Sequence, residues 1–427
     1  MLLVILLLLA KDAAAGKLGL CCMECDATEY GPFANVSSWA YRYSLFVDDP
    51  GAAQWLVDNQ VEFVPHLAHK HVPLPGGDAC NLDAAKGETP LCTAAMLDRA
   101  AAAARVPSRL TVTYMMGWNE AYDKGNSKAA YKYIAPADAA TFWRVYVQGM
   151  AARANLSLVS PTTGVEPNKL AWLGNMILEC WAQRRQGCDV ETIVAFSVHD
   201  YKCGEEYWRA AYGPGGTFQA KLKAHLYNAS HPDLSLSVAG LSVLGDAKNW
   251  SSYVDARQIW VTETNCNGDY GFPPTQAVSG EEQCRRITGQ RAGAECGQYG
   301  KCGVGSIAAM ESMPTIARVS WWNTHQQNAQ HRQKTADAML VDDTGTLYPP
   351  GRALVGGLSS RVDCAAPPPS PAATCDAQLA KDGCDPEQGP KACGACAQLH
   401  RADLDRVGCS AANVTDYCEG KLPPALH

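Results

Sequence analysis

The sequence has no cluster of lysine and arginine residues, and its formal net charge is -7 over 427 residues. Proteins that bind nucleic acid or an anionic membrane surface carry basic patches that neutralise phosphate groups. We therefore expect neither nucleic acid nor an anionic membrane as the main partner. The sequence also has no G-x-S-x-G motif, so it does not support serine-hydrolase chemistry of that type.

Long apolar runs are also lacking. The run at residues 2–10 is too short to cross a bilayer as a helix, and no other stretch is long and apolar enough. Three alanines at residues 13–15 offer a cleavage site, although Lys11 follows the run and no basic residue precedes it. We interpret residues 1–15 as a secretory signal peptide, and we expect no membrane span in the mature chain.

Cysteine, in contrast, is abundant. Nineteen cysteines are too many for a typical cytosolic chain of this size and predict disulfides formed in an oxidising compartment. Because the number is odd, at least one thiol is free, intermolecular or absent from the mature protein. We expect a glycoprotein that is secreted, extracellular or in a cell wall. Five N-x-S/T sequons are compatible with this, at Asn35, Asn155, Asn228, Asn249 and Asn413.

Short β-like runs alternate with helical runs from about residue 35, which is typical of βα units. The pattern predicts a barrel-sized unit, which we place at residues 16–362. Expected strands lie at residues 38–47, 61–66, 111–116, 156–160, 192–201, 256–263 and 316–323, and expected helices at residues 94–105, 137–155, 169–183 and 217–228.

The composition changes abruptly after this unit. Residues 363–374 are rich in proline and predict an extended, semi-rigid linker. Residues 375–420 contain six cysteines. A segment that small needs cross-links to hold a fold, so we predict a small disulfide-rich, helical C-terminal module. Its role is either to bind polysaccharide or wall matrix or to act as a structural tail.

Two β-rich runs end in a carboxylate. The run at residues 111–123, TVTYMMGWNEAYD, contains Glu120, and the run at residues 258–265, QIWVTETN, contains Glu263. In a (β/α)8 barrel the catalytic groups project from the C-terminal ends of the strands. Two carboxylates at such ends are the minimum equipment for breaking a glycosidic bond. Either residue alone is equally consistent with a surface charge where a strand meets a loop.

The two carboxylates are predicted to have different roles. Glu120 is the expected general acid/base, so its pKa must be raised, which burial beside Trp118 can supply. Glu263 is the expected nucleophile of a retaining mechanism. Trp39, Trp118 and one of the pair 321–322 are expected where strands end, where sugar stacking and core packing are equally consistent. Adjacent residues face opposite sides of a strand, so one tryptophan of the pair points into the barrel mouth.

These motifs resemble glycoside hydrolase family 128, of the glycosyl hydrolase catalytic core group in the large retaining (β/α)8 clan. The likeness is carried by GWNE at residues 117–120, SVHDY at 197–201 and WVTE at 260–263, and it extends over roughly residues 39–358. The family pattern is roughly G-[FW]-N-E-P-D, H-x-Y and W-[LV]-T-E-[FW]. The resemblance implies a TIM barrel that hydrolyses β-1,3-glucan without a metal or an organic cofactor.

The resemblance also implies roles for individual residues. It makes Glu120 the acid/base and Glu263 the nucleophile, and it gives Asn119 a hydrogen bond to the sugar 2-hydroxyl. Three further residues are implied to contact the substrate: His199, Tyr201 and Trp321.

The sequence departs from the family pattern beside both carboxylates, where Ala121 replaces a proline and Thr264 replaces an aromatic residue. The leading hypothesis is a secreted retaining endo-glycosidase acting on β-1,3-glucan. One alternative is the same hydrolysis of another β-glycan such as mannan. Another is a wall-associated polysaccharide-binding protein with little or no turnover. Histidines 66, 69 and 71 have no recognised metal-ligand spacing with nearby carboxylates, so we predict no metal site.

Overall fold

The computed structural model describes most of the barrel-sized unit and parts of the C-terminal region. The expected signal peptide and the linker from residue 365 onward lie outside the described residues. The described residues are 17–22, 25–69, 71–74, 79–82, 91–103, 109–123, 133–202, 205–230, 249–265, 279–289, 306–322, 324, 339–342, 345–358, 362–364, 379, 383–384, 389–400, 404 and 411–419.

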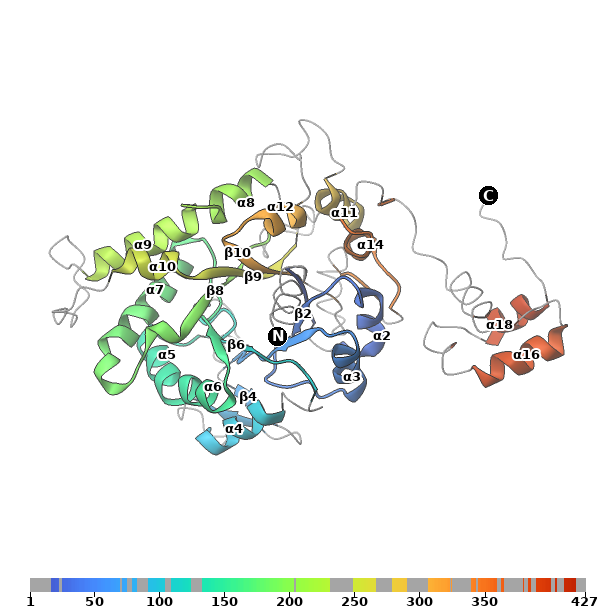
Figure 1. Ribbon diagram of the computed structural model, residues 1–427, viewed down its shortest axis with the longest axis horizontal. Coiled ribbons are helices and arrows are strands. Elements are labelled where there is room, and N and C mark those ends of the chain that lie inside the picture. The colour runs from blue at the N-terminus through green and yellow to red at the C-terminus, as the bar shows by residue number, and fades with distance from the viewer. Residues whose placement is uncertain are drawn as a thin grey trace, which may run out of the picture.

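Eight parallel strands form one sheet that closes into a barrel (Figure 1). Their order in the sheet is β3-β2-β1-β10-β9-β8-β7-β6. A parallel bridge between His66 and Met116 joins the two end strands, and the Phe63 N–H donates to the Thr111 carbonyl beside it. The predicted (β/α)8 TIM barrel is therefore confirmed. The strands are β1 (Leu18–Cys21), β2 (Trp39–Tyr41), β3 (Glu62–Val64), β6 (Tyr114–Met116), β7 (Ser157–Val159), β8 (Ile193–His199), β9 (Gln258–Thr264) and β10 (Ile316–Trp321).

One strand differs from the expectation. We expected the first strand at residues 38–47, but β1 precedes it and pairs with both β2 and β10. The sequence of β1 is Leu-Gly-Leu-Cys, and a glycine within so short a run weakens the strand pattern. Without β1 the sheet would not close.

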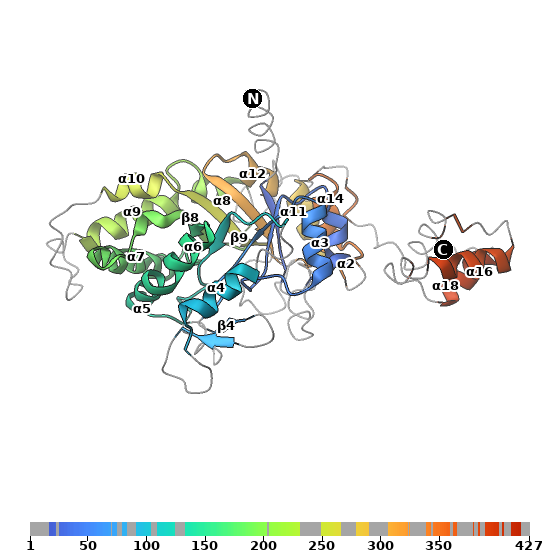
Figure 2. The same ribbon diagram turned by 60° about the horizontal axis from the view of Figure 1, so that its bottom comes forward.

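Helices surround the barrel and pack on its outer surface (Figures 1 and 2). The predicted helix at residues 137–155 forms as one continuous unit with a π-helical turn at Trp143–Val147. A two-stranded hairpin, β4 (His71–Pro73) and β5 (Ala79–Asn81), follows β3. The helices are α2 (Ala27–Tyr30), α3 (Pro50–Asp58), α4 (Ala94–Ala103), α5 (Pro136–Phe142), α6 (Gln148–Ala154), α7 (Pro167–Ala182), α8 (Glu205–Tyr212), α9 (Thr217–Ser230), α10 (Trp250–Asp255), α11 (Gly280–Thr288), α12 (Ser306–Ser312), α14 (Pro349–Val355), α16 (Pro390–Leu399) and α18 (Ala411–Cys418), with short 3₁₀ turns at Gly31–Phe33, Arg184–Gln186 and Val190–Thr192.

The barrel wall separates two apolar cores. The larger core fills the space between the strands and the surrounding helices. The smaller one lies inside the barrel and draws alternate residues from the strands, as the period of two requires. None of the helices in the described parts of the chain is long and apolar enough to cross a membrane. The interior core consists of Cys21, Trp39, Tyr41, Val64, Met116, Val159, Ala195, Trp260 and Trp322.

The C-terminal region is disulfide-rich and helical, as predicted. Helices α16 and α18 pack on each other, and both figures draw them apart from the barrel. Two disulfides, Cys384–Cys396 and Cys393–Cys418, cross-link this small unit. Its own core contains Leu379, Ala397 and Leu404 together with the cysteines. The cross-links compensate for the small area that such a segment can bury.

Candidate active site

Glu120 lies in a tight turn that follows β6. The turn begins at Gly117, where a Cβ would lie 2.7 Å from the backbone nitrogen of Pro161, so only glycine fits the approach of the two chains. Glu120 itself has a φ of 47°, which is rare for a residue other than glycine. Asn119 is anchored by its backbone N–H, which donates to the Ala68 carbonyl. The turn therefore holds Asn119 and Glu120 in a fixed conformation at the barrel mouth.

Glu263 reaches the barrel mouth because β9 contains an irregularity. Trp260 lies inside the barrel and Val261 outside it, so strict alternation would turn Glu263 outward. The pairing of β8 with β9 shifts by one residue, from Val198 opposite Val261 to His199 opposite Glu263. A β-bulge of this kind redirects the side chain that follows it.

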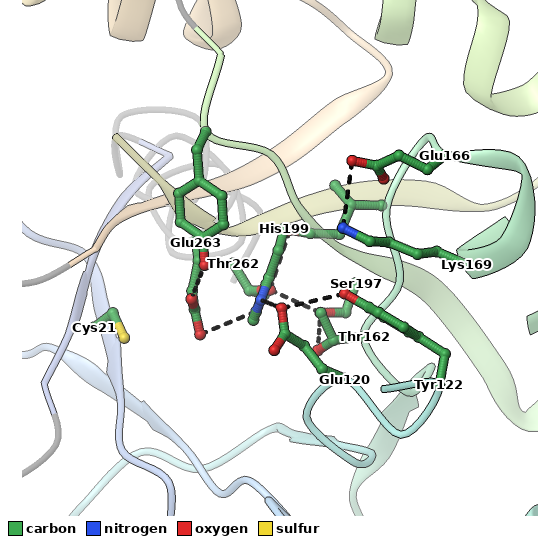
Figure 3. Close-up of polar contacts among 12 residues, drawn as sticks. Cys21, Glu120, Tyr122, Thr162, Glu166, Lys169, Ser197, His199, Thr262 and Glu263 are labelled. Carbon is green, nitrogen blue, oxygen red and sulfur yellow. Dashed lines mark hydrogen bonds and ion pairs between the residues drawn. The ribbon is translucent and has the colours of Figure 1, made fainter. Parts of the chain in front are cut away.

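The imidazole of His199 lies between the two carboxylates (Figure 3). Its Nδ1 is 3.3 Å from Glu120 Oε1, and its Nε2 is 3.1 Å from Glu263 Oε1. Only the contact with Glu120 has hydrogen-bond alignment. His199 is 4% exposed, and its backbone N–H donates to the Thr163 carbonyl. The structure therefore brings Glu120, His199 and Glu263 together, from three different strands.

Two tyrosine hydroxyls hold the carboxylate of Glu263. Tyr201 donates to its Oε2 and Tyr43 donates to its Oε1. The side chain of Glu263 is only 4% exposed. Burial raises the pKa of this carboxyl above its usual range, and the negative charge of Glu120 acts in the same direction. His199 and the two hydroxyl donors oppose the rise.

Glu120 has a more open environment. Its side chain is 22% exposed, and the hydroxyl of Tyr122 donates to its Oε1 over 3.1 Å. Burial, with the nearby Glu120 charge, raises the pKa of Tyr122, so this hydroxyl stays protonated and able to donate. Trp118, expected beside Glu120, instead packs against Trp143 in the outer core at a ring distance of 6.0 Å.

A layer of hydroxyl groups lies under the carboxylates inside the barrel (Figure 3). The Ser197 hydroxyl is 2.9 Å from that of Thr162 and 2.7 Å from that of Thr262. The Thr262 hydroxyl also donates to the Val198 carbonyl. These contacts link the segment after β7 with β8 and β9, so they fix the strand ends that carry His199 and Glu263.

The tryptophans are placed differently from the expectation. Trp118 and Trp321 are 0% exposed and belong to the outer core. Trp39 is the first residue of β2 and therefore lies at the N-terminal end of the barrel, where its indole donates to the Lys17 carbonyl. The structure thus does not bring these three to the carboxylates. Trp322 is the member of the pair that faces inward, with its ring 6.0 Å from that of Tyr201.

Unpaired polar atoms line the same region. Asn119 is 5% exposed, and its Oδ1 is buried without a hydrogen-bond partner. His66 follows β3, is 1% exposed and packs edge-on against Tyr41. Neither of its ring nitrogens has an aligned hydrogen bond, and burial lowers its pKa. Within the described residues, no three His, Cys, Asp or Glu side chains form a set that could hold a metal ion.

The sequence analysis missed Tyr43 and Tyr122. It expected one tryptophan of the pair 321–322 to face inward, and the resemblance implied Trp321 instead of Trp322. Tyr122 follows Glu120 by two residues, so its position in the motif was a usable signal. Tyr43 and Trp322 follow strand residues Tyr41 and Ser320 by two, so the period of the strands carries each of them to the inner face. The pattern could not reveal how far the alternation of inward and outward side chains continues beyond the last hydrogen-bonded residue of each strand.

The family model for the glycosyl hydrolase catalytic core matches residues 32–210 of this chain. This range contains Asn119, Glu120 and His199 but ends before β9 and Glu263. The predicted resemblance to the catalytic core group is thereby confirmed for these residues. A search of curated proteins finds no match.

The fold is similar to several solved structures of glycoside hydrolase family 128. One is a subgroup II endo-β-1,3-glucanase from Sorangium cellulosum, with 20% identity, a TM-score of 0.45, and coverage of 82% of this chain and 100% of that chain. A subgroup I endo-β-1,3-glucanase from Amycolatopsis mediterranei, in complex with laminarihexaose, has 14% identity, a TM-score of 0.44, and coverage of 80% and 99%. A subgroup V exo-β-1,3-glucanase from Cryptococcus neoformans has 16% identity, a TM-score of 0.44, and coverage of 81% and 100%. Residues 32–210 thus match the glycosyl hydrolase catalytic core, and this match supports a glycoside hydrolase.

Proposed function

We propose that this glycoside hydrolase cleaves β-1,3-glucan with retention of configuration, using Glu120 as acid/base and Glu263 as nucleophile. The observation that carries the proposal is the single imidazole of His199, which lies within 3.3 Å of both carboxylates. A retaining enzyme needs two carboxyl groups on either side of one glycosidic bond. Carboxylates that converge on one buried ring from separate strands support the proposal.

The environments of the carboxylates support this division of roles. Glu263 is nearly enclosed, with a hydroxyl donor on each oxygen, as suits a group that stays ionised and attacks the anomeric carbon. Glu120 is more open, which allows it to protonate the leaving oxygen and then to take a proton from the incoming water. We assign the hydrogen bond with the sugar 2-hydroxyl to Asn119, whose Oδ1 has no hydrogen-bond partner in the structure.

The substrate class comes from the motifs and from the related proteins. The GWNE, SVHDY and WVTE motifs resemble family 128, and the similar solved structures are named as β-1,3-glucanases. We assign the sugar-facing aromatic role to Trp322 rather than to Trp321, because Trp322 lies on the inner face of the barrel. The assignment of endo rather than exo cleavage rests on the sequence resemblance.

We further propose that the protein is secreted and that the C-terminal unit is a separate module. The six disulfides among the described residues are compatible with an extracellular protein. The domain boundaries stay a prediction: a signal peptide at residues 1–15, the catalytic barrel at 16–362, a linker at 363–374 and the module at 375–420. The module either binds wall or matrix polysaccharide or serves as a structural tail.

The test is release of reducing ends from soluble β-1,3-glucan by the purified protein, with mannan and β-1,4-glucan as controls. We expect activity on the first substrate, its loss in Glu263→Gln, and a first-formed product with the β configuration in a time-resolved NMR spectrum. An α product would refute retention. Equal activity of wild type and Glu263→Gln would refute the assignment of the nucleophile. Binding without turnover on all three glycans would favour a polysaccharide-binding protein.

A further inference from the structure

Tyr43 contacts the predicted nucleophile although it lies outside the three motifs. It follows β2, whereas Tyr201 follows β8, and the two hydroxyls donate to different oxygens of Glu263. The Tyr43 ring is half-buried and packs against two neighbours, Tyr41 at 5.9 Å and His66 at 5.5 Å. These rings fix the direction of the Tyr43 hydroxyl toward the carboxylate.

The thiol of Cys21 lies behind Tyr43. Cys21 ends β1, is fully buried, and is free, while its neighbour Cys22 forms a disulfide with Cys25 on the outer side of the strand. Its Sγ is 3.9 Å from the Tyr43 hydroxyl oxygen. Burial raises the pKa of the Cys21 thiol, and the charge of Glu263 raises it further, so the thiol keeps its proton. It can then donate to Tyr43, whose own proton points to Glu263.

We propose that Tyr43 is a second positioning residue for Glu263, oriented by the thiol of Cys21, and that it sets the lower pH limit of the enzyme. The inference rests on the proposed function, because it treats Glu263 as the nucleophile. A hydroxyl that donates to a carboxylate favours the ionised form. The hydroxyl of Tyr43 therefore keeps the nucleophile charged in a site where burial and the second carboxylate disfavour the charge. The titratable groups that interact with Glu263 among the described residues are Cys21, Tyr41, Tyr43, Glu120, Tyr122, His199 and Tyr201.

The first test is the pH dependence of kcat/KM for Tyr43→Phe. Loss of the hydroxyl leaves the ring in place but removes one hydrogen-bond donor from the Glu263 carboxylate, which raises its pKa. The acidic limb of the pH profile should therefore shift to higher pH by about one unit. Tyr253→Phe is the matched control. Its hydroxyl is also buried, but it donates to the backbone carbonyl of Val190 over 3.2 Å, away from the carboxylates, so that variant should leave the limb in place. A limb that does not move in Tyr43→Phe overturns the proposal.

A second test does not depend on turnover. The four proteins of a double-mutant cycle, wild type, Tyr43→Phe, Glu263→Gln and the double variant, are compared by thermal unfolding at several pH values. We expect a coupling between the two positions at pH 7 that declines as the carboxyl is protonated. Absence of coupling at every pH overturns the proposal. If no protein of the set cleaves any glycan, the proposed function fails, while the cycle still decides the role of Tyr43.

Cys21→Ala keeps the hydroxyls of Tyr43 and Tyr201, and it is the alternative test if Tyr43→Phe does not fold. It removes the donor that orients Tyr43, so the acidic limb should move in the same direction by a smaller amount. An unmoved limb, with normal thermal unfolding, would show that Tyr43 needs no such donor and would overturn the part of the proposal that concerns Cys21.

Discussion

At the scale of single residues, the two carboxylates differ in the polar groups around them. Three side chains contact Glu263, namely Tyr43, His199 and Tyr201, and its side chain is 4% exposed. The side chain of Glu120 is 22% exposed and accepts from Tyr122. A group that must alternate between acid and base needs access to the leaving oxygen and to water. The more open of the two carboxylates therefore suits the acid/base role.

The pH profile of the wild type follows from the burial of Glu263. The proposed nucleophile acts as the carboxylate, and burial raises its pKa above the ordinary value of 4.5. Activity should therefore be lost as the pH falls through this raised pKa, at a higher pH than an exposed glutamate would give. The measurement is kcat/KM against pH, which reports groups of the free enzyme. An acidic limb at or below the ordinary value would contradict the assignment.

Replacement of Glu120 tests the acid role by its dependence on the leaving group. Glu120→Gln should reduce the rate on β-1,3-glucan by ~10²–10⁴-fold, because the departing sugar oxygen is no longer protonated. Formation of the glycosyl-enzyme from an activated nitrophenyl glycoside should suffer much less, since that leaving group departs without a proton. Burst kinetics measure this step.

The control for Glu120→Gln is Glu282→Gln, because Glu282 of α11 is a partly buried carboxylate that pairs with Arg286 at 2.8 Å on the outside of the barrel. It should retain near-wild-type rates on both substrates. An equal loss on glucan and on the activated glycoside in Glu120→Gln would mean that Glu120 does not act as the acid.

At the scale of elements, the connection from β8 to α8 fixes two of the site residues. His199 and Tyr201 face the site, while Asp200 between them points outward and accepts hydrogen bonds from Tyr207 and Tyr212 of α8. The backbone N–H of Asp200 donates to the Glu263 carbonyl over 3.0 Å. One buried carboxylate thus ties α8 to the strand ends that carry the chemistry.

This anchor predicts a pH-dependent stability. Burial raises the pKa of Asp200 from 3.8 to about 6, against the hydroxyl donors that lower it. The folded state binds the Asp200 proton more tightly than the unfolded state does. The contribution of this proton to the free energy of unfolding is therefore complete below the pKa of the unfolded state and is lost as the pH rises through about 6. Asp200→Asn removes the titration. The melting temperature of Asp200→Asn relative to wild type should therefore rise by a few degrees between pH 4 and pH 7.

The control for Asp200→Asn is Asp98→Asn, since Asp98 pairs with Arg153 at the surface over 2.7 Å. Exposed pairs contribute little, so its melting temperature should track that of the wild type across this range. A constant difference between Asp200→Asn and wild type at all pH values would show that Asp200 does not titrate in the folded state.

The strands also show which features of the fold the sequence predicts and which it does not. The seven expected strands were predicted from their apolar runs. β1 was missed although it is no shorter than β2, because the run Leu-Gly-Leu-Cys contains a glycine, which weakens the strand pattern. The motifs located Glu120, His199, Tyr201 and Glu263 in one place. They did not reveal the bulge in β9, because backbone pairing is decided by β8 and β10 on either side. Local strand pairing of the same kind, at the end of β10, decides which of Trp321 and Trp322 faces the barrel interior.

At the scale of the whole molecule, disulfides span very different lengths of chain. Cys284 of α11 pairs with Cys364 beyond α14, at a sequence separation of 80, and thus ties the end of the barrel region to an earlier helix. Cys180 of α7 pairs with Cys188 at a separation of 8. All four cysteines are at most 2% exposed. The two bridges therefore differ mainly in the length of the loop that they close.

This pair allows a test of how the cross-links stabilise the barrel. In the chain-entropy account, a disulfide stabilises by restricting the unfolded chain, and its effect grows with the logarithm of the loop length. Removal of Cys284–Cys364 by double alanine substitution should therefore lower the free energy of unfolding by about 2 kcal/mol more than removal of Cys180–Cys188. Urea unfolding of the two variants and the wild type measures the difference. Equal losses would mean that local packing, rather than loop closure, determines what each bridge contributes.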